Sequence, residues 1–283
     1  MAPPSESQID RKSLTDSTMK LIEKERRALA VLENLGSVAV AYSGGADSTL
    51  VCALAKEALG EKAIAVIGIS QVDPREELLE ARKTAKKMGI RLFEIEIPLM
   101  KNSRFVSNRP DRCYHCKKLL FEAIAKLAKE KHVNNVVDGT TKDDISDYRP
   151  GMWAKKIFKV KSPLLEAGMR KEDVRALLKK RGIETWSKPQ AACLASRIPY
   201  GVKITKNSLK MIGSAEKYLR NLGFEQVRVR AHGPVARIEV DEKEMKKLLS
   251  KRMNVSRKLK KLGFVYVTID MEGYRTGSMN EVL

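Results

Sequence analysis

A run of small and polar residues stands where an apolar stretch gives way to a helix-like one. Residues 43–48 read Ser-Gly-Gly-Ala-Asp-Ser and follow the apolar stretch 38–42. Glycines let backbone N–H groups approach a phosphate, and a helix N-terminus adds about half a positive charge. The hydroxyls of Ser43 and Ser48 can donate to the same anion, and a Mg²⁺ shared with Asp47 would offset the repulsion from that carboxylate. The run therefore predicts a polyphosphate site, and a tight turn capped by Asp47 is the plainer alternative.

The chain has four cysteines, three of them outside apolar stretches. Cys113 and Cys116 form a Cys-x-x-Cys motif flanked by cations, and neighbouring positive charge lowers a thiol pKa and favours the thiolate that attacks or ligates. Cys193 lies in the segment 189–201, which has little regular periodicity. Cys52 lies in an apolar stretch and is typical of a packing thiol. Cys113, Cys116 and Cys193 are therefore the candidates for chemistry.

Three interpretations of the Cys-x-x-Cys motif are open from the residues alone. A zinc knuckle needs four ligands, and beyond the motif only Cys193, His115 and the poorly placed Cys52 are available. A thioredoxin-like dithiol sits at the start of a helix, and this motif precedes a predicted helix. An iron–sulfur cluster held by three cysteines, with one iron open, would take Cys193 as its third ligand.

Strand-like and helix-like stretches alternate over the first half of the chain. The predicted helices cover residues 8–35, 49–59, 73–89 and 117–132, and the predicted strands cover residues 37–42, 63–69, 91–97 and 135–141. Apolar runs rich in β-branched residues are typical of buried parallel strands, so this alternation predicts an α/β fold with a doubly wound parallel sheet. Ligands of such sheets bind beyond the carboxyl ends of the strands, where the run 43–48, Ser70 and the segment 139–143 all fall.

The pattern changes after residue 200. Helices are predicted over 207–222 and 242–262, and strands over 227–229, 235–240 and 265–269. This order predicts a smaller α+β domain over residues 201–283. Residues 1–200, with the N-terminal helix, form the nucleotide-binding domain in this prediction.

The chain is strongly basic, with a net charge of +20 and a pI near 9.8. Its lysines and arginines are spread along the whole sequence, and aromatic residues make up only 5% of it. Nucleic-acid binding is therefore disfavoured against attraction of small polyanions. No apolar run approaches the roughly 20 residues of a membrane span, and the polar N-terminus has no signal peptide. We expect a cytoplasmic protein with reduced thiols and no membrane contact.

Residues 43–48, with their strand–loop–helix context, resemble the PP-loop of the ATP pyrophosphatases, whose pattern is Ser-Gly-Gly-x-Asp-Ser. This resemblance implies the fold of the adenine nucleotide alpha hydrolases, binding of ATP with Mg²⁺, transfer of AMP to a carboxylate or carbonyl oxygen, and release of pyrophosphate. It implies ATP contacts from Ser43, Gly44, Gly45, Asp47, Ser48, Ser70 and Thr141. Thr141, Asp143 and Asp144 follow a strand, where they either help to hold metal or ribose or cap the next helix.

Further segments resemble the LarE-type sulfur transferases, the PP-loop enzymes of nickel-pincer nucleotide synthesis. They are residues 193–201, 228–233, 236–240 and 273–281, so that with the PP-loop the likeness runs from about Val38 to Glu281. It implies an enzyme that adenylates a carboxylate of pyridinium-3,5-biscarboxylic acid mononucleotide and installs sulfur to give a thiocarboxylate. It also implies a homo-oligomer, a hexamer, with a small-molecule nucleotide as partner. The domain 201–283 would then serve the substrate and sulfur transfer and oligomerisation.

That family has two branches, which differ in the source of the sulfur. In one, a single cysteine that matches Cys193 surrenders its own sulfur and becomes dehydroalanine. In the other, three cysteines hold a [4Fe-4S] cluster, and a sulfide on the open iron is delivered. Because this chain has Cys113, Cys116 and Cys193, we favour the cluster branch.

Two arginines are suited to a substrate phosphate. Arg228 and Arg230 alternate on one face of a predicted strand, since strand side chains repeat every two residues, and they make a fork for a phosphate. The resemblance implies the same role, and a solvated strand face is the alternative. The resemblance also implies that the substrate site includes Ser196, Arg275, Glu216 and Glu239. From the same resemblance we expect Cys193, Asp47 and Arg197 to be the catalytic residues.

Three competing functions stay open. A PP-loop tRNA thiolase also combines this loop with a Cys-x-x-Cys motif, but the chain has no aromatic-rich RNA-binding module. An amide-forming ligase with structural cysteines would bind no cluster and would use an amine nucleophile. A non-enzymatic nucleic-acid-binding protein explains the charge and leaves residues 43–48 unexplained.

Overall fold

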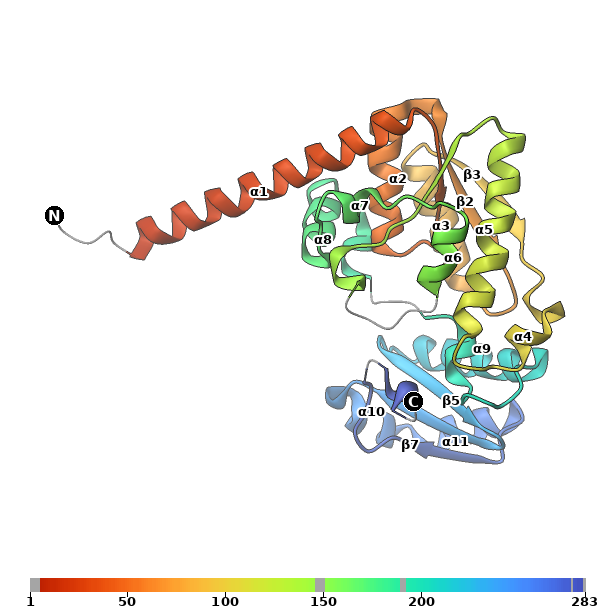
Figure 1. Ribbon diagram of the computed structural model, residues 1–283. Helices are drawn as coiled ribbons and strands as arrows, with labels where there is room; N and C mark the ends of the chain where they lie inside the picture. The colour runs from red at the N-terminus through yellow and green to blue at the C-terminus, as the bar shows by residue number, and fades with distance from the viewer. Residues whose placement is uncertain (1–5, 146–150, 189–191, 276, 282–283) are drawn as a thin grey trace. The chain divides into compact units, whose positions relative to one another are not determined.

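The computed structural model describes residues 6–145, 151–188, 192–275 and 277–281, and Figure 1 labels their helices and strands. The chain divides into two compact units. The first unit comprises residues 1–68, 79–95 and 120–188, and the second comprises residues 69–78, 96–119 and 189–283. The second unit thus includes two short segments that lie before residue 200, whereas the sequence suggests a single boundary there.

A four-stranded parallel sheet confirms the predicted fold class. Its strands are β1 (Val38–Ala41), β2 (Ala63–Ile69), β3 (Arg91–Glu96) and β4 (Asn135–Val137), in the order β3-β2-β1-β4. Strand β1 pairs in parallel with β2 from Val38↔Ala63 and with β4 from Val38↔Asn135. Residues 38–40 are completely buried, as expected for a central strand covered on both faces.

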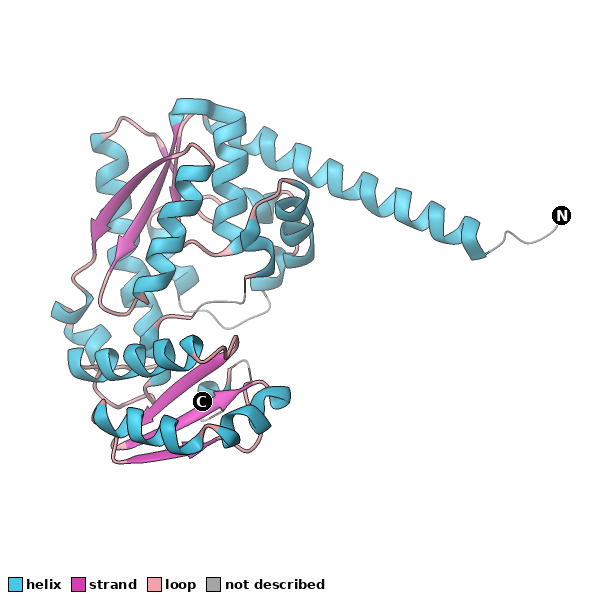
Figure 2. Cartoon of the chain, turned by 180° about the vertical axis from the view of Figure 1, so that it is seen from behind, coloured by secondary structure: helices cyan, strands magenta, loops and turns pink. Residues whose placement is uncertain are grey.

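Helices flank this sheet (Figure 2). The long ones are α1 (Glu6–Leu35), α2 (Ala46–Leu59), α3 (Arg75–Lys87), α5 (Arg112–Glu130) and α8 (Lys171–Lys180), and the short ones are α6 (Gly151–Ile157) and α7 (Pro163–Glu166). The short helix α4 (Ser103–Val106) belongs to the second unit. Helix α2 packs against α1 and α8 and buries Leu50, Val51 and Leu54. Along the described parts of the chain, no helix combines the length and the apolar character that crossing a bilayer takes.

The C-terminal part of the second unit forms a small mixed sheet. Strands β5 (Val227–His232) and β6 (Val235–Val240) pair antiparallel, and β7 (Tyr266–Ile269) lies parallel to β6. Helix α9 (Lys206–Asn221) packs on β5, α11 (Arg252–Lys261) packs on β7, and the two helices touch each other. This arrangement confirms the predicted smaller α+β region.

Two predicted helices differ from the observed ones. The helix predicted over 242–262 is broken into a 3₁₀ turn at 242–244, α10 (Met245–Ser250) and α11, because Lys251 leaves helical geometry at ψ +6°. The helix predicted from 117 begins instead at Arg112, two residues after Pro110, which is a natural place for a helix to start. Both cysteines of the Cys-x-x-Cys motif therefore lie in the first turns of α5.

Candidate active site

The PP-loop (residues 43–48) joins the end of β1 to the start of α2 and is braced by its own hydroxyls. The backbone N–H of Ser43 donates to Ser48 Oγ at 3.2 Å, and Ser48 Oγ lies 3.2 Å from the carbonyl of Gly45. Thr49 Oγ1 donates to the same carbonyl at 2.8 Å. Gly44 has a φ of +75°, a conformation that side chains disfavour. The loop is therefore shaped before any ligand binds.

Gly139 is where the loop after β4 meets the PP-loop. A Cβ at Gly139 would lie 2.6 Å from the backbone nitrogen of Ser48 and 2.7 Å from the carbonyl carbon of Asp47. Only glycine fits at that distance. Strands β1 and β4 are neighbours on the side opposite β2, so this is the switch point of the sheet, where doubly wound folds bind ligands. The Asp-Gly-Thr-Thr sequence after an apolar stretch hints at such a close approach, but sequence reasoning missed it.

A buried lysine fixes the residues on both sides of Gly139. Lys155 on α6 is 9% exposed, and its Nζ lies 3.0 Å from Asp138 Oδ2, 2.6 Å from Thr140 Oγ1 and 2.7 Å from Ser162 Oγ. Ser162 Oγ also donates to Asp138 Oδ1 at 2.7 Å. Sequence reasoning missed this network too, because it predicts no element around α6.

The residues after Gly139 act as helix caps in this structure. Thr141 is completely buried, and its hydroxyl donates to Asp144 Oδ2 at 2.9 Å. Asp143 accepts from the backbone N–H of Lys171, at the start of α8, at 2.7 Å. Asp144 also pairs with Lys171 Nζ at 3.2 Å. Of the two alternatives for Thr141, Asp143 and Asp144, these contacts support capping.

Ser70, the predicted ATP contact at the end of β2, lies in the second unit. Its backbone N–H and its hydroxyl both donate to Asp73 Oδ2, at 2.8 Å and 2.6 Å. Burial nevertheless raises the pKa of Asp73, against the lowering effect of these bonds. Asp73 also adds to the raised pKa of Cys116, which places Ser70 and Asp73 in the neighbourhood of the cysteines.

The three candidate cysteines all belong to the second unit and act on one another electrostatically. Burial raises the pKa of Cys116 to about 12, with smaller contributions from Cys193 and Cys113. Burial also raises the pKa of Cys193, where Cys113 contributes and the charges of Arg112 and Arg197 oppose. Each of these thiols is free, so no disulfide links them.

These shifts correct one expectation. Flanking cations were expected to lower the thiol pKa of the motif, and Lys117 does act in that direction on Cys116, but burial outweighs it. Cys52 is fully buried and burial raises its pKa as well, in keeping with a packing thiol. Among the residues with described side chains, no three His, Cys, Asp or Glu side chains lie close enough to share one metal ion.

The carboxylate of Glu216 holds a buried arginine beside Cys193. Arg197 is 1% exposed, and its Nε and Nη2 lie 2.8 Å and 3.2 Å from the two oxygens of the fully buried Glu216. Glu216 also accepts from the backbone N–H of Val229 at 3.1 Å. Burial alone would raise the pKa of Glu216, but the positive charges of Arg197, Arg228 and Arg220 outweigh burial and lower it. Arg197 Nη1 in turn donates to the carbonyl of Cys193 at 3.0 Å.

Arg230 forms a second buried pair. Its Nε and Nη2 lie 2.9 Å and 2.6 Å from the oxygens of Glu239, which is completely buried. Its Nη1 donates to the carbonyl of Ser196 at 3.1 Å, and Ser278 Oγ lies 3.0 Å from Glu239 Oε1. Two of the three guanidinium nitrogens of Arg230 thus hold a carboxylate rather than standing open as one arm of a phosphate fork.

Arg228 differs from its neighbour. It is 6% exposed, which rules out the solvated strand face, and its guanidinium lies over the ring of Tyr274 at 5.3 Å. Burial lowers the pKa of Arg228, and Arg197 lowers it further. The three buried guanidinium groups of Arg197, Arg228 and Arg230 belong to one cluster with the buried carboxylates of Glu216 and Glu239. An anion bound beside these cations would be stabilised by them.

Arg275 lies at the edge of this cluster. It pairs with Asp270 at 3.4 Å, Glu272 at 2.5 Å and Glu281 at 3.2 Å, and its side chain is 32% exposed. Asp270 also pairs with Arg237, which contacts Glu239 at 3.1 Å. Arg275 is therefore connected to the buried cluster through Asp270 and Arg237, and its carbonyl also accepts from the backbone N–H of Ser278, whose hydroxyl binds Glu239.

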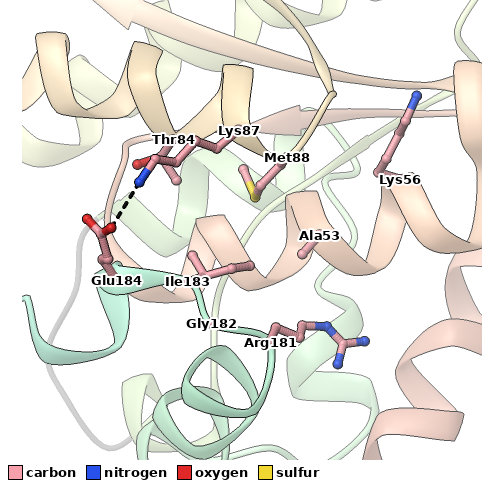
Figure 3. Close-up of a pocket in the computed structure, with 9 residues that line it drawn as sticks. All are labelled: Ala53, Lys56, Thr84, Lys87, Met88, Arg181, Gly182, Ile183 and Glu184. Atoms are coloured by element: carbon pink, nitrogen blue, oxygen red, sulfur yellow. Dashed lines mark hydrogen bonds and ion pairs between the residues drawn. The ribbon is translucent and has the colours of Figure 1, made fainter.

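A cavity of about 310 Å³ in the first unit lies apart from the PP-loop residues (Figure 3). Its three cations are already paired: Lys87 with Glu184 at 2.9 Å, Lys56 with Glu61 at 2.5 Å and Arg181 with Glu57 at 2.6 Å. Ala53, Met88 and Ile183 supply much of the remaining lining. The cavity contains no predicted site residue and offers no unbalanced charge, so it is not the candidate active site.

Known proteins resemble this chain along nearly its whole length. A pyridinium-3,5-bisthiocarboxylic acid mononucleotide synthase of Lactiplantibacillus plantarum is 38% identical over 93% of this chain and 96% of its own length. Uncharacterized proteins of Synechocystis and Methanocaldococcus jannaschii are 40% and 31% identical, over 86% and 84% of this chain and 92% and 91% of their own lengths. The NAD synthase family model matches residues 18–118, which include the PP-loop. The chain therefore belongs to the LarE-type family of the Lactiplantibacillus synthase and is an ATP-dependent sulfurtransferase.

Proposed function

We propose that this enzyme adenylates a carboxylate of pyridinium-3,5-biscarboxylic acid mononucleotide and converts it into a thiocarboxylate. The relative from Lactiplantibacillus is named as the synthase of the bisthiocarboxylic acid mononucleotide. The observation that carries the proposal is the connection between a cysteine and a cluster of buried arginines. Arg197 donates to the carbonyl of Cys193, and Arg230 donates to the carbonyl of Ser196.

The first half-reaction needs a site for pyrophosphate. A carboxylate oxygen attacks the α-phosphorus of ATP, and the bond to pyrophosphate breaks with negative charge gathering on the leaving group. The backbone N–H groups of the PP-loop and the N-terminus of α2 would stabilise that charge, assisted by the hydroxyls of Ser43 and Ser48. Asp47, in the first turn of α2, would share a Mg²⁺ with the phosphates.

The mononucleotide phosphate would bind at the buried arginines. Burial and the nearby charge of Arg197 both lower the pKa of Arg228, so its guanidinium is a buried cation close to another one. A phosphate bound beside these arginines would stabilise their positive charges. Arg230 and Arg197 then act chiefly by holding the backbone of residues 193–196 against the phosphate site.

The second half-reaction needs a sulfur nucleophile. Sulfur attacks the acyl carbon of the acyl-adenylate, AMP leaves with one carboxylate oxygen, and the thiocarboxylate remains. Three thiols of one unit act on one another electrostatically, which supports a [4Fe-4S] cluster in which each thiolate would bind a different iron. Cys113, Cys116 and Cys193 would hold it, and when bound it would supply the transferable sulfide on its open iron.

Anaerobic reconstitution with iron and sulfide tests the sulfur source. We expect iron and acid-labile sulfide to be retained, and the thiocarboxylate to form from ATP, Mg²⁺ and the mononucleotide. Alanine at Cys113, Cys116 or Cys193 should abolish retention, whereas the control Cys52→Ala should not. A mass loss of about 34 Da at Cys193 after turnover, expected for loss of H₂S to give dehydroalanine, would overturn the cluster as the source, as would full activity of iron-free protein.

The same resemblance leads us to propose a cytosolic homo-oligomer. Reduced thiols, which the proposed cluster requires, persist in the cytosol. Analytical ultracentrifugation of the purified enzyme measures the oligomer, and a single species at the mass of one chain would contradict it.

A further inference from the structure

Asn108 is a buried residue in an unusual backbone conformation. It is completely buried and has a φ of +56°, in the left-handed region that asparagine tolerates better than most residues. Its Nδ2 lies 3.2 Å from the carbonyl oxygen of Ile198, 2.8 Å from that of Pro199 and 3.0 Å from that of Val202. The side-chain amide therefore gathers three carbonyl groups of one distant segment.

The other end of the same amide binds the start of α5. Asn108 Oδ1 accepts a hydrogen bond from Nη1 of Arg112, which is 5% exposed. The guanidinium of Arg112 also lies over the ring of Tyr200 at 4.6 Å. Arg112 Nε is buried, and among the described groups it has no hydrogen-bond partner.

The backbone strengthens this connection. The N–H of Gly201 donates to the carbonyl of Asn108 at 3.0 Å, and the N–H of Ile204 donates to the carbonyl of Val106 at 2.9 Å. Residues 106–112 and 198–204, which we call the clamp, are thus joined by side-chain and backbone bonds within the second unit.

The two halves of the clamp adjoin the two cysteine segments in the chain. Asn108 precedes Cys113 by five residues, and Ile198 follows Cys193 by five. Arg112 directly precedes Cys113 and stacks on Tyr200, seven residues after Cys193. The bonds of the Asn108 side chain therefore help to set the distance between the start of α5 and the 3₁₀ turn that Cys193 caps.

We propose that Asn108 is a positioning residue that holds Cys193 in place relative to Cys113 and Cys116. This inference rests on the proposed function, in which these thiols act together. Three thiols that must become thiolates repel one another until iron binds, so the scaffold has to supply the geometry in advance. An amide is suited to this task because it presents two N–H donors and one acceptor, whereas Asp would set a carboxylate against three carbonyl oxygens.

The test compares Asn108→Asp with Asn254→Asp, which adds the same charge at an exposed position of α11 in the same unit. Iron and sulfide retained after reconstitution are measured, together with the alkylation rate of Cys193 in reduced, iron-free protein. Asn108→Gly, which keeps the backbone conformation, is measured in parallel in case the charge prevents folding. Circular dichroism and the Kd for ATP establish that the fold and the PP-loop are unchanged.

We expect both Asn108 variants to retain less than half of the wild-type iron and to alkylate Cys193 at least tenfold faster, with ATP binding unchanged. Asn254→Asp should match the wild type in every measurement. Faster alkylation in the Asn108 variants, with no iron retained even by the wild type, would support the positioning role and contradict the cluster. Wild-type alkylation rates and wild-type iron content in both folded Asn108 variants would overturn the proposal.

Discussion

The PP-loop and the arginine cluster are both suited to anions, but they are built in opposite ways. The PP-loop uses backbone N–H groups and two hydroxyls, and its shape depends on glycines at positions 44 and 139. The arginine cluster uses side chains that are at least 94% buried and are held by the carboxylates of Glu216 and Glu239. A backbone site depends on the space around it, whereas a side-chain site depends on its charge balance. The five predictions below test this difference.

The largest effect is expected where the charge balance of the cluster is broken. Glu216→Ala would leave Arg197 buried without its bidentate partner, which typically costs about 3–5 kcal/mol of unfolding free energy. Denaturant unfolding measures this loss. Arg220→Ala removes a contact to the same carboxylate from a part-exposed arginine, and it should cost about 1 kcal/mol or less. Equal losses for the two variants would mean that burial of the pair is unimportant.

At the PP-loop, the corresponding charge is that of Asp47. We expect Asp47→Ala to abolish Mg²⁺-dependent binding of ATP, because the phosphates lose the carboxylate that shares their metal. Unfolding free energy should change far less, since an acidic side chain in the first turn of a helix contributes only about 0.3–1 kcal/mol. Isothermal titration of ATP with and without Mg²⁺ is the measurement, and unchanged affinity would remove Asp47 from the site.

Arg228→Ala should separate the two anion sites. A charge-assisted contact is worth about 1.5–3 kcal/mol, so the Kd for the mononucleotide should rise about ten- to a hundredfold while the Kd for ATP stays constant. Arg228→Lys, which keeps the charge, should lose less. Matched losses for ATP and the mononucleotide would show that the arginine cluster does not bind the substrate phosphate.

A methyl group added at Gly139 should affect the PP-loop by steric contact alone. Gly139→Ala would place its Cβ 2.6 Å from the nitrogen of Ser48, and such overpacking typically costs about 1–3 kcal/mol. At Gly45, a Cβ would meet only Ser43 Oγ, at 3.5 Å, so Gly45→Ala is the matched control for stability. Thermal unfolding should distinguish the two, and a stable Gly139→Ala variant with normal ATP affinity would contradict the close approach.

The smallest effect is expected on the unfolding free energy when the pH is lowered. Because the folded pKa of Glu216 is below its ordinary value of 4.5, its pairing stabilises the protein above that value and the contribution is lost as the pH falls through the folded pKa. Unfolding free energy should therefore decline below about pH 4.5, and the decline should be shallower in Glu216→Gln. An identical pH profile for the variant would mean that other carboxylates dominate the acid response.

The sequence predicted the features that depend on local chemistry. Apolar, β-branched runs identified all four strands of the parallel sheet, and the residue types of the PP-loop identified its place between strand and helix. Residues 112–116 mix charged, aromatic and sulfur-bearing side chains without apolar periodicity, so the start of α5 was placed five residues too late. The ATP contacts, the substrate contacts and the cluster ligands remain predictions.

Features that depend on distant residues were not predictable. Arg230 was expected in a phosphate fork, but its Nε and Nη2 bind Glu239 on the neighbouring strand β6. The network of Lys155 joins residues up to 24 positions apart, as in the bond from Ser162 to Asp138. Nothing in the local sequence of Asn108 indicates that it gathers three carbonyls about 90 residues away. Such contacts arise only when the fold brings the segments together.

The contact between Gly139 and the PP-loop also restricts how this enzyme can change over generations. A side chain at position 139 and the present path of residues 47–48 exclude each other, because no flexible group separates them. A descendant that replaced Gly139 would need a compensating shift in the PP-loop, so the two segments are expected to vary together rather than independently. Among many related sequences, we expect glycine at this position wherever the Ser-Gly-Gly-x-Asp-Ser pattern is kept.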